Sequence, residues 1–377
     1  MPLIPDIQTL TDIVKAEIEA EKDQNRHYTT LNQILDFFSE PELTTIEHIL
    51  SHIRSLVEVI QKETFGEIAK TNLKSLDKRI CQIISNCVGA KLPEDSPTSP
   101  YHQLGNWVSA ISREHPVELF TTNYDLLVEQ AFEELGIPYF DGFNGSNRAF
   151  FDLSSIENDK LPSRWARLWK LHGSINWWRS ETGKIERRLP SDAGEQQMIY
   201  PSHLKYEQSR RLPYLAMLDR LKFFLAPGKG PAVLVTCGYS FADEHINGLL
   251  VDSLRGNPSA VCYCLLYEEL EKEQYKEARL CSKKQPNLRI LAKNGAIIGT
   301  TEDLWHQDKK EPGLLNGFVN QTITPASEVS GQMVAEDSVK HEFLLGDFAA
   351  LGRFLLQQCG QFAQQETSTT PAHVALV

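Results

Sequence analysis

The sequence lacks the cysteine patterns that hold a structural metal or a disulfide framework. Its 377 residues include seven cysteines, an odd number, and no two of them form a C-x-x-C pair. Zinc modules use paired ligands, and a disulfide framework needs an even set of cysteines. We therefore expect reduced, mostly buried thiols in a cytoplasmic protein, and no metal site.

Positive charge and long apolar runs are also scarce. Lysine and arginine total 38 against 50 aspartates and glutamates, which gives a formal net charge of -12. Phosphate binding depends on clustered cations, so we expect no direct nucleic-acid partner. No window approaches the roughly 18 apolar residues of a membrane span. The first residues, with Pro2, Pro5 and Asp6, are unlike a signal peptide, and we expect no membrane partner.

The sequence does contain enough apolar residues, 41%, to form a sizeable core. In the first hundred residues the apolar spacing is helical over 9–22, 46–60 and 73–88. From about residue 101, helical segments alternate with strand-length apolar runs at 117–120, 167–171, 232–238, 260–267 and 288–291. This alternation predicts an α/β fold with a Rossmann-like, mostly parallel, doubly wound sheet.

The composition also predicts how the chain is divided. Residues 1–312 are expected to form one domain that carries a large helical insertion at about 40–100. Residues 313–336 are rich in polar residues without a period, which is typical of a linker. Residues 337–377 are expected to form a small appendage of one amphipathic helix and a disordered tail from 365 onward.

Three of the predicted strands are followed by small or polar residues. In parallel sheets the carboxyl ends of the strands line the crevice in which ligands bind. The three segments are therefore expected to face one crevice. They are Thr121-Thr122-Asn123-Tyr124-Asp125, Leu171-His172-Gly173-Ser174-Ile175-Asn176-Trp177 and Gly238-Tyr239-Ser240-Phe241.

These residue types suit cleavage of the bond between nicotinamide and ribose, which passes through an oxocarbenium-like transition state. His172 could act as the base, because an imidazole titrates near neutral pH. Asn123 offers both a donor and an acceptor, and Asp125 could orient a ribose hydroxyl or stabilise positive charge. Gly238 and Ser240 could let the backbone approach the adenosine half of a dinucleotide.

Each of these residues also has a structural interpretation. His172 could be a packing residue, Asn123 could form an Asx-turn, and Asp125 could cap the following helix. Asp243 is expected to cap the helix that follows it rather than to act in catalysis. Trp177 and its neighbour Trp178 could cover a ligand or simply pack in the core.

With Thr45-Ile46-Glu47-His48-Ile49-Leu50, the three segments resemble the sirtuin-like NAD-dependent family over about residues 1–300. Specifically, they resemble its bacterial branch of sirtuin-like NAD hydrolases from anti-phage defence. The resemblance implies NAD+ as the substrate and His172, Asn123 and Asp125 as catalytic residues. It further implies a cofactor-binding set of Thr122, Gly173, Gly238 and Ser240.

The resemblance implies an NAD+ glycohydrolase that releases nicotinamide and ADP-ribose and depletes NAD during infection. Hydrolysis and cyclisation of the ADP-ribose product are both compatible with it. Proteins of this branch often form homo-oligomers, and some act with a HerA-type ATPase. A protein deacylase is the third candidate. Deacylases of the family hold zinc with four cysteines beside the peptide groove, and this sequence has no paired cysteines.

The resemblance also exposes a difference from the family pattern. The family begins with a strand and a Gly-Ala-Gly-x-Ser loop that binds the pyrophosphate, and this sequence contains neither. Met1-Pro2 stands where a later Gly-x-Pro motif is expected, and the glycine-rich segment 227–231 precedes a strand instead of following one. The alternative function is therefore a catalytically silent assembly or nucleotide-sensing subunit.

Overall fold

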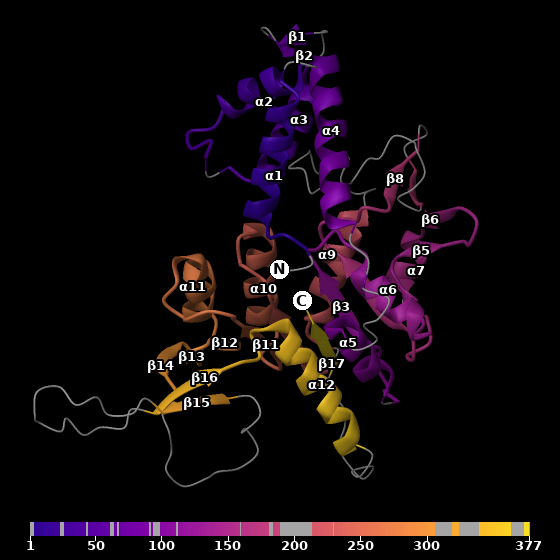
Figure 1. Cartoon of the computed structure of the whole chain (residues 1–377). Coiled ribbons are helices and arrows are strands. Elements are labelled where there is room, and N and C mark those ends of the chain that lie inside the picture. Colours follow the sequence, from indigo (N-terminus) through magenta and orange to yellow (C-terminus); the bar gives the residue numbers. More distant parts are fainter. Residues whose placement is uncertain are drawn as a thin grey trace, which may run out of the picture.

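A nine-stranded sheet and a separate group of four helices form the two main parts of the molecule (Figure 1). The computed structural model describes residues 4–22, 26–42, 44–60, 64–65, 68–89, 92, 99–110, 112–158, 160–180, 184–188, 213–228, 230–305, 319–323, 339–362 and 373–376. No helix in these ranges has the length and apolar character needed to cross a membrane.

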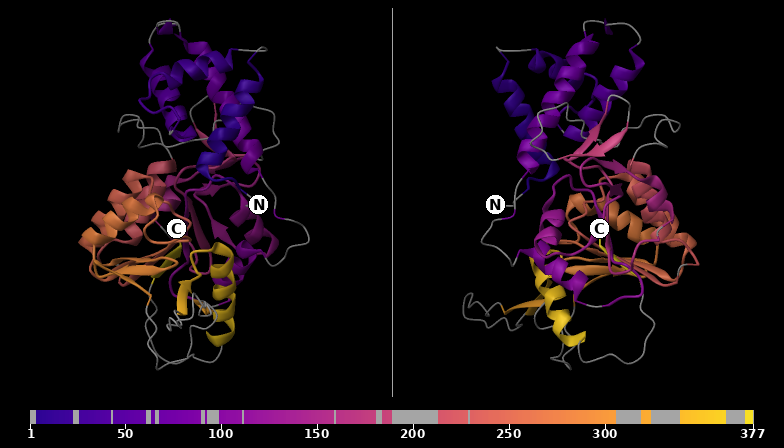
Figure 2. Two further views of the ribbon diagram at one scale, coloured as in Figure 1. Left: turned by 60° about the vertical axis from the view of Figure 1, so that its left-hand side comes forward. Right: turned by 90° about the vertical axis from the view of Figure 1, so that its right-hand side faces the viewer.

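The four N-terminal helices stand together at one end of the molecule (Figure 1 and Figure 2). We call them the helical unit: α1 (Ile7–Ala20), α2 (His27–Leu35), α3 (Ile46–Val59) and α4 (Lys70–Val88). Two short antiparallel strands, β1 (Thr64–Phe65) and β2 (Ile68–Ala69), connect α3 to α4. Apolar residues spaced three and four apart bury one face of each helix in a shared core. That core also contains Tyr124 and Ile175, so the helical unit packs directly on the α/β part.

The large sheet has the order β14-β13-β12-β11-β10-β17-β3-β7-β4. Its strands are β3 (Glu118–Thr121), β4 (Tyr139–Phe140), β7 (Ala166–Lys170), β10 (Ala232–Cys237), β11 (Ala260–Leu265), β12 (Leu288–Leu291), β13 (Gly295–Ile298), β14 (Thr301–Leu304) and β17 (His373–Leu376). Neighbours from β4 to β12 pair in parallel, and only β13 and β14 at one edge are antiparallel. The predicted α/β class with a mostly parallel, Rossmann-like sheet is confirmed.

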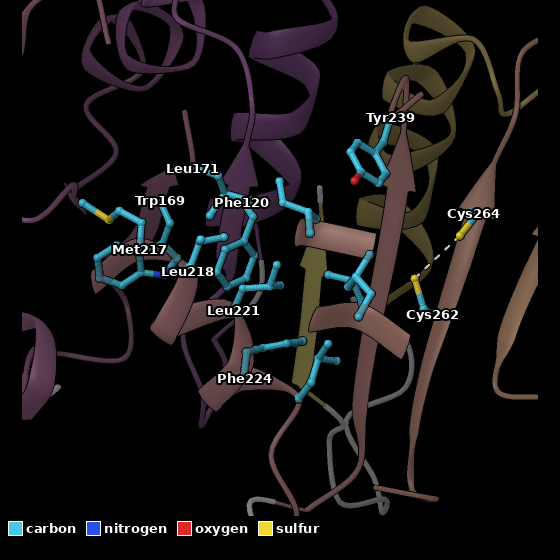
Figure 3. Close-up of a cluster of buried hydrophobic side chains, with 14 of the residues drawn as sticks. Phe120, Trp169, Leu171, Met217, Leu218, Leu221, Phe224, Tyr239, Cys262 and Cys264 are labelled. Atoms are coloured by element: carbon cyan, nitrogen blue, oxygen red, sulfur yellow. Dashed lines mark hydrogen bonds between the residues drawn. The ribbon is translucent and has the colours of Figure 1, made fainter. Parts of the chain in front are cut away.

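Helices cover both faces of this sheet, because alternate strand residues point to opposite faces. One face packs against α9 (Pro213–Phe224), α10 (Glu244–Gly256) and α11 (Lys276–Lys284); Figure 3 shows Phe120, Trp169 and Cys262 among its buried side chains. The neighbouring strand residues Leu119 and Leu168 face α5 (Pro100–Ser109), α6 (Leu127–Glu134) and α12 (Phe348–Phe362) instead. The sheet is therefore doubly wound.

Smaller elements complete the fold. A four-stranded antiparallel sheet joins β5 (Phe143–Asn144), β6 (Ala149–Phe151), β8 (Trp177–Arg179) and β9 (Ile185–Arg187). The remaining pieces are α7 (Leu153–Asn158), the 3-10 helix η1 (Glu273–Tyr275), and the antiparallel pair β15 (Val319–Ile323) and β16 (Val339–Phe343).

The C-terminal region differs from the sequence prediction in two places. Strand β15 lies inside the expected linker 313–336, and β17 lies inside the tail that was expected to be disordered. β17 takes an interior position of the large sheet, between β10 and β3, where Ala375 is paired with both Leu234 and Glu118. Its backbone supplies partners to β3 and β10, whose inner edges would otherwise bury unpaired N–H and C=O groups. The remainder of both segments lies outside the described residues.

Candidate functional site

The carboxyl ends of β3, β7 and β10 lie at the same edge of the sheet, with β17 between β3 and β10, near the point where the strand order changes direction. From β3 the chain adds β7 and β4 on one side, and it then continues with β10, β11 and β12 on the other. Ligands of doubly wound sheets bind in the crevice at such a point. The backbone ties the first two loops together, because the Ile175 N–H donates to the Tyr124 carbonyl over 3.1 Å. The predicted convergence of the loops after β3 and β7 is therefore present.

His172 follows β7 directly and lies at the centre of a cluster of four side chains, of which three contact it. Its Nε2 is 2.9 Å from Oδ2 of Asp243, and its Nδ1 is 3.5 Å from Oε1 of Glu47. The Tyr124 hydroxyl donates a hydrogen bond to the same Glu47 oxygen. The rings of Tyr124 and His172 are 6.3 Å apart between centroids. We call Glu47, Tyr124, His172 and Asp243 the histidine cluster.

The two carboxylates determine the charge of His172. Burial alone would lower the pKa of the imidazole, but the hydrogen bonds and charges of Asp243 and Glu47 outweigh it and raise the pKa to about 9. Burial likewise opposes ionisation of Glu47 and Asp243, yet the bonds to His172 leave both pKa values lowered. At neutral pH the cluster therefore holds an imidazolium between two carboxylates. The expectation that His172 titrates near neutral pH does not hold in this arrangement.

Asp243 performs two tasks with its two oxygens. Oδ1 accepts hydrogen bonds from the backbone N–H groups of His245 and Ile246, over 2.9 and 3.1 Å, and so caps α10. Oδ2 binds His172. The sequence predicts that Asp243 caps α10. The bonds of Oδ1 to the helix hold the carboxylate in place, and this positions Oδ2 beside the imidazole of His172.

Asn123 and Asp125 flank Tyr124 but occupy different environments. Asn123 is exposed, and its backbone N–H donates to Oγ1 of Thr121 over 3.0 Å, with the half-buried Thr122 between them. Asp125 is 4% exposed, and its Oδ1 accepts from the N–H of Leu127 over 3.0 Å. This contact forms an Asx-turn just before α6, whose N-cap residue is Leu126 and not Asp125.

The loop after β10 presents its small residues to solvent. Gly238 and Ser240 are both exposed, and Gly238 has a φ of +75°, with open space where a side chain would project. Phe241 has a φ of 58°, an uncommon value for a large side chain. Buried Asn247 holds this shape by donating to the Phe241 carbonyl over 2.7 Å and accepting from the Tyr239 hydroxyl over 2.8 Å. The open backbone at Gly238 and Ser240 is compatible with close approach of a ligand.

The loop after β7 turns sharply immediately behind His172. Gly173 has a φ of 95°, a left-handed value that favours glycine. Trp177 and Trp178 are 1% and 2% exposed, and Trp177 packs on Phe143 with ring centroids 5.3 Å apart. The two tryptophans therefore pack in the core, as in the structural interpretation.

Sequence reasoning did not identify two members of the histidine cluster, Glu47 and Tyr124. Tyr124 stands between two residues chosen for their polarity, and its hydroxyl is polar as well. Glu47 belongs to segment 45–50, which supported the family resemblance but assigned Glu47 no role in the site. Its position in the first turn of a helix gave no indication that it would reach His172.

The described residues contain no group of three or more His, Cys, Asp or Glu side chains that could hold a metal ion. All seven cysteines are free thiols.

Comparison with known proteins places this geometry in a family. Residues 117–291 match the model of the SIR2-like domain. A search of the curated proteins finds no match to the chain. The matched range runs from β3 to β12 and includes Tyr124, His172 and Asp243, whereas Glu47 precedes it. Residues 117–291 are therefore a SIR2-like domain, which supports the sirtuin-like resemblance for this part of the chain.

Proposed function

We propose that this protein is an NAD+ glycohydrolase that cleaves the bond between nicotinamide and ribose with water. A SIR2-like domain is consistent with an NAD-related function. The observation that carries the proposal is the position of His172, immediately after β7 at the carboxyl end of the sheet, in contact with Asp243 from the loop that follows β10. Asn123 in the loop after β3, and Gly238 and Ser240 in the loop after β10, are exposed.

The reaction that we propose is a substitution at the anomeric carbon of the nicotinamide ribose. The oxygen of a water molecule bonds to that carbon while the carbon–nitrogen bond to nicotinamide breaks, through an oxocarbenium-like transition state. The products are nicotinamide, ADP-ribose and one proton. His172 takes that proton when its imidazole is neutral, and Asn123 orients the reacting groups with its amide. We propose that Asp125 stabilises the turn that follows Asn123.

The test is NAD+ consumption by the full-length protein and by His172→Ala. Wild-type protein should convert NAD+ to nicotinamide and ADP-ribose, and the variant should lose at least 100-fold in rate, the usual contribution of a general base. His115→Ala, placed before β3 and outside the crevice, is the matched control. Equal turnover by His172→Ala and wild type would refute the assignment. Chromatography of the products separates ADP-ribose from its cyclic form.

A second candidate is a catalytically silent subunit that senses a nucleotide or supports an assembly. The paired carboxylates around His172 favour it, because an imidazolium held from both sides has no vacant site for a proton. This function predicts calorimetric binding of ADP-ribose with no loss of NAD+ at any pH up to 9.5. Turnover that appears as His172 becomes neutral would exclude it.

We also propose the biological setting that the family resemblance implies. The protein would deplete NAD+ in anti-phage defence, as a homo-oligomer, and a HerA-type ATPase is a candidate partner. Light scattering of the purified protein tests the first association, and co-purification with such an ATPase tests the second. Survival of infected cells that carry the His172→Ala variant tests the role in defence.

A further inference from the structure

Glu47 reaches the site from outside the SIR2-like domain. It lies in the first turn of α3, in the helical unit, and its side chain is 32% exposed. Its neighbours Ile46, Ile49 and Leu50 are completely buried, so the core of the helical unit fixes the position of this turn. Tyr124, from the SIR2-like domain, is buried in the same core and donates its hydroxyl to Glu47.

The side chains that contact His172 come from three different elements. Asp243 at the start of α10 and Glu47 on α3 are the two carboxylates, and Tyr124 faces the ring from the loop after β3. Behind Asp243 lie the phenols of Tyr239 and Tyr214. Burial and the charge of Asp243 raise the pKa of both phenols, that of Tyr214 to about 12, so they stay neutral at physiological pH. The local charge therefore consists of one cation and two anions.

The two carboxylates hold His172 from opposite sides of its ring. Asp243 contacts Nε2 and Glu47 contacts Nδ1. Contacts at both nitrogens fix the plane of an imidazole, whereas one contact leaves it able to rotate. We propose that Glu47 is a positioning residue, which fixes the orientation and the protonation of His172 and so makes the helical unit a part of the site.

This role deepens the proposed function, on which its consequence for turnover rests. With Glu47 in place, both imidazole nitrogens are occupied and His172 keeps its proton. Displacement of α3, or loss of the Glu47 charge, removes one of the two stabilising carboxylates and frees Nδ1. The proton is then held less tightly, and a neutral imidazole able to accept a proton from water becomes more populated.

The test measures the titration of His172 directly, without NAD+. Protein labelled with 13C at the histidine ring is titrated between pH 5 and 10 by NMR, and the His172→Ala spectrum identifies the signal. The wild-type midpoint is expected near pH 9. In Glu47→Gln we expect it to fall by about one pH unit or more, a tenfold loss of proton affinity. Glu42→Gln removes the same charge from an exposed site of the same unit and should leave the midpoint unchanged.

Two further variants keep the result interpretable. Glu47→Asp retains the charge but withdraws it from the ring, so the midpoint should fall by less than in Glu47→Gln. Asp243→Asn should lower the midpoint as well, since it removes the other carboxylate. If circular dichroism shows that Glu47→Gln is not folded, the titration of Glu47→Asp is used to test the proposal instead. A midpoint in either folded Glu47 variant that equals the wild-type value, while Asp243→Asn shifts, would overturn the proposal.

The consequence for turnover is measured separately. If the protein hydrolyses NAD+, the pH of half-maximal rate should fall in Glu47→Gln by the same amount as the NMR midpoint, and Glu42→Gln should match wild type. A purely structural role of Glu47 would lower the rate at every pH without moving this profile. Absence of turnover in all variants would count against the proposed function and leave the NMR result standing.

Discussion

The charged state of His172 should make the stability of the protein depend on pH above neutrality. The folded protein holds the His172 proton up to about pH 9, whereas the unfolded chain releases it near 6.5. Between these values the folded state binds more protons than the unfolded state. The stabilisation is therefore complete below pH 6.5, and it is lost as the pH rises through 9.

The magnitude follows from the two pKa values. The rise from 6.5 to about 9, at about 1.4 kcal/mol for each pKa unit, corresponds to about 3 kcal/mol. His172 is 7% exposed, so solvent screens the interaction little. Unfolding entropy is about 2.1 cal/mol/K per residue, or about 0.8 kcal/mol/K for 377 residues that unfold together. The expected decrease in melting temperature from this one group is thus about 4 °C between pH 6 and pH 10.

The assay compares wild type with His172→Gln, which cannot be protonated. Melting temperatures are recorded at intervals between pH 6 and pH 10, and the variant's profile is subtracted from that of the wild type to remove all other ionisations. The difference should shrink by about 4 °C across the window, with most of the change above pH 7. Parallel profiles would show that His172 does not hold an extra proton in the folded state, and the ion pairs with Glu47 and Asp243 would have to be abandoned.

Two further predictions concern the framework beneath the site. Lys170→Met should destabilise the protein by about 3–5 kcal/mol in urea unfolding, because it leaves Glu129 buried without the ammonium 2.8 Å away. Lys170→Met combined with Glu129→Leu should recover most of the loss. Ala375→Pro should cost about 3 kcal/mol and increase amide exchange in β3 and β10, since Ala375 lies in register with Leu234 and Glu118 on its two sides. Unchanged exchange in those strands would contradict the position of β17 between β3 and β10.

The sequence predicts the α/β part of this fold well, for a physical reason. Strands β3, β7, β10, β11 and β12 pack in the two cores that flank the sheet, so they appear in the sequence as short, mainly apolar runs between helical segments. Once the strands are predicted, their carboxyl ends are known, and so is the position of a polar residue such as His172 at one of those ends. Periodicity and length are local properties of the chain, and these elements depend on little else.

The interior strand β17 could not be predicted in this way. β17 has only four residues, next to a polar stretch, and its local signal is weak. Its position depends on the two edges that β3 and β10 offer after the rest of the sheet has formed. Pairing with distant strands determines this element, whereas the local pattern favours a tail.

The histidine cluster was only partly accessible from the sequence for the same reason. His172 is recognisable from its place after β7, and Asp243 from its place before α10. Glu47, in contrast, lies 77 residues before Tyr124 in the chain, and packing of the helical unit alone brings them together. The pKa of His172 depends on that contact, so its protonation could not be predicted from residue type alone.

The two carboxylates of the cluster are not equally fixed, and this difference decides which one controls His172. Asp243 accepts two backbone N–H groups of α10 with the oxygen that does not bind His172, so it cannot move without uncapping that helix. Glu47 is held by one phenol hydroxyl and remains a third exposed. Losing one hydrogen bond to a carboxylate costs about 1.5–3 kcal/mol, whereas losing a helix cap and its two bonds to a carboxylate costs more. Any motion that frees the imidazole should therefore begin at Glu47, which places control of His172 in the helical unit.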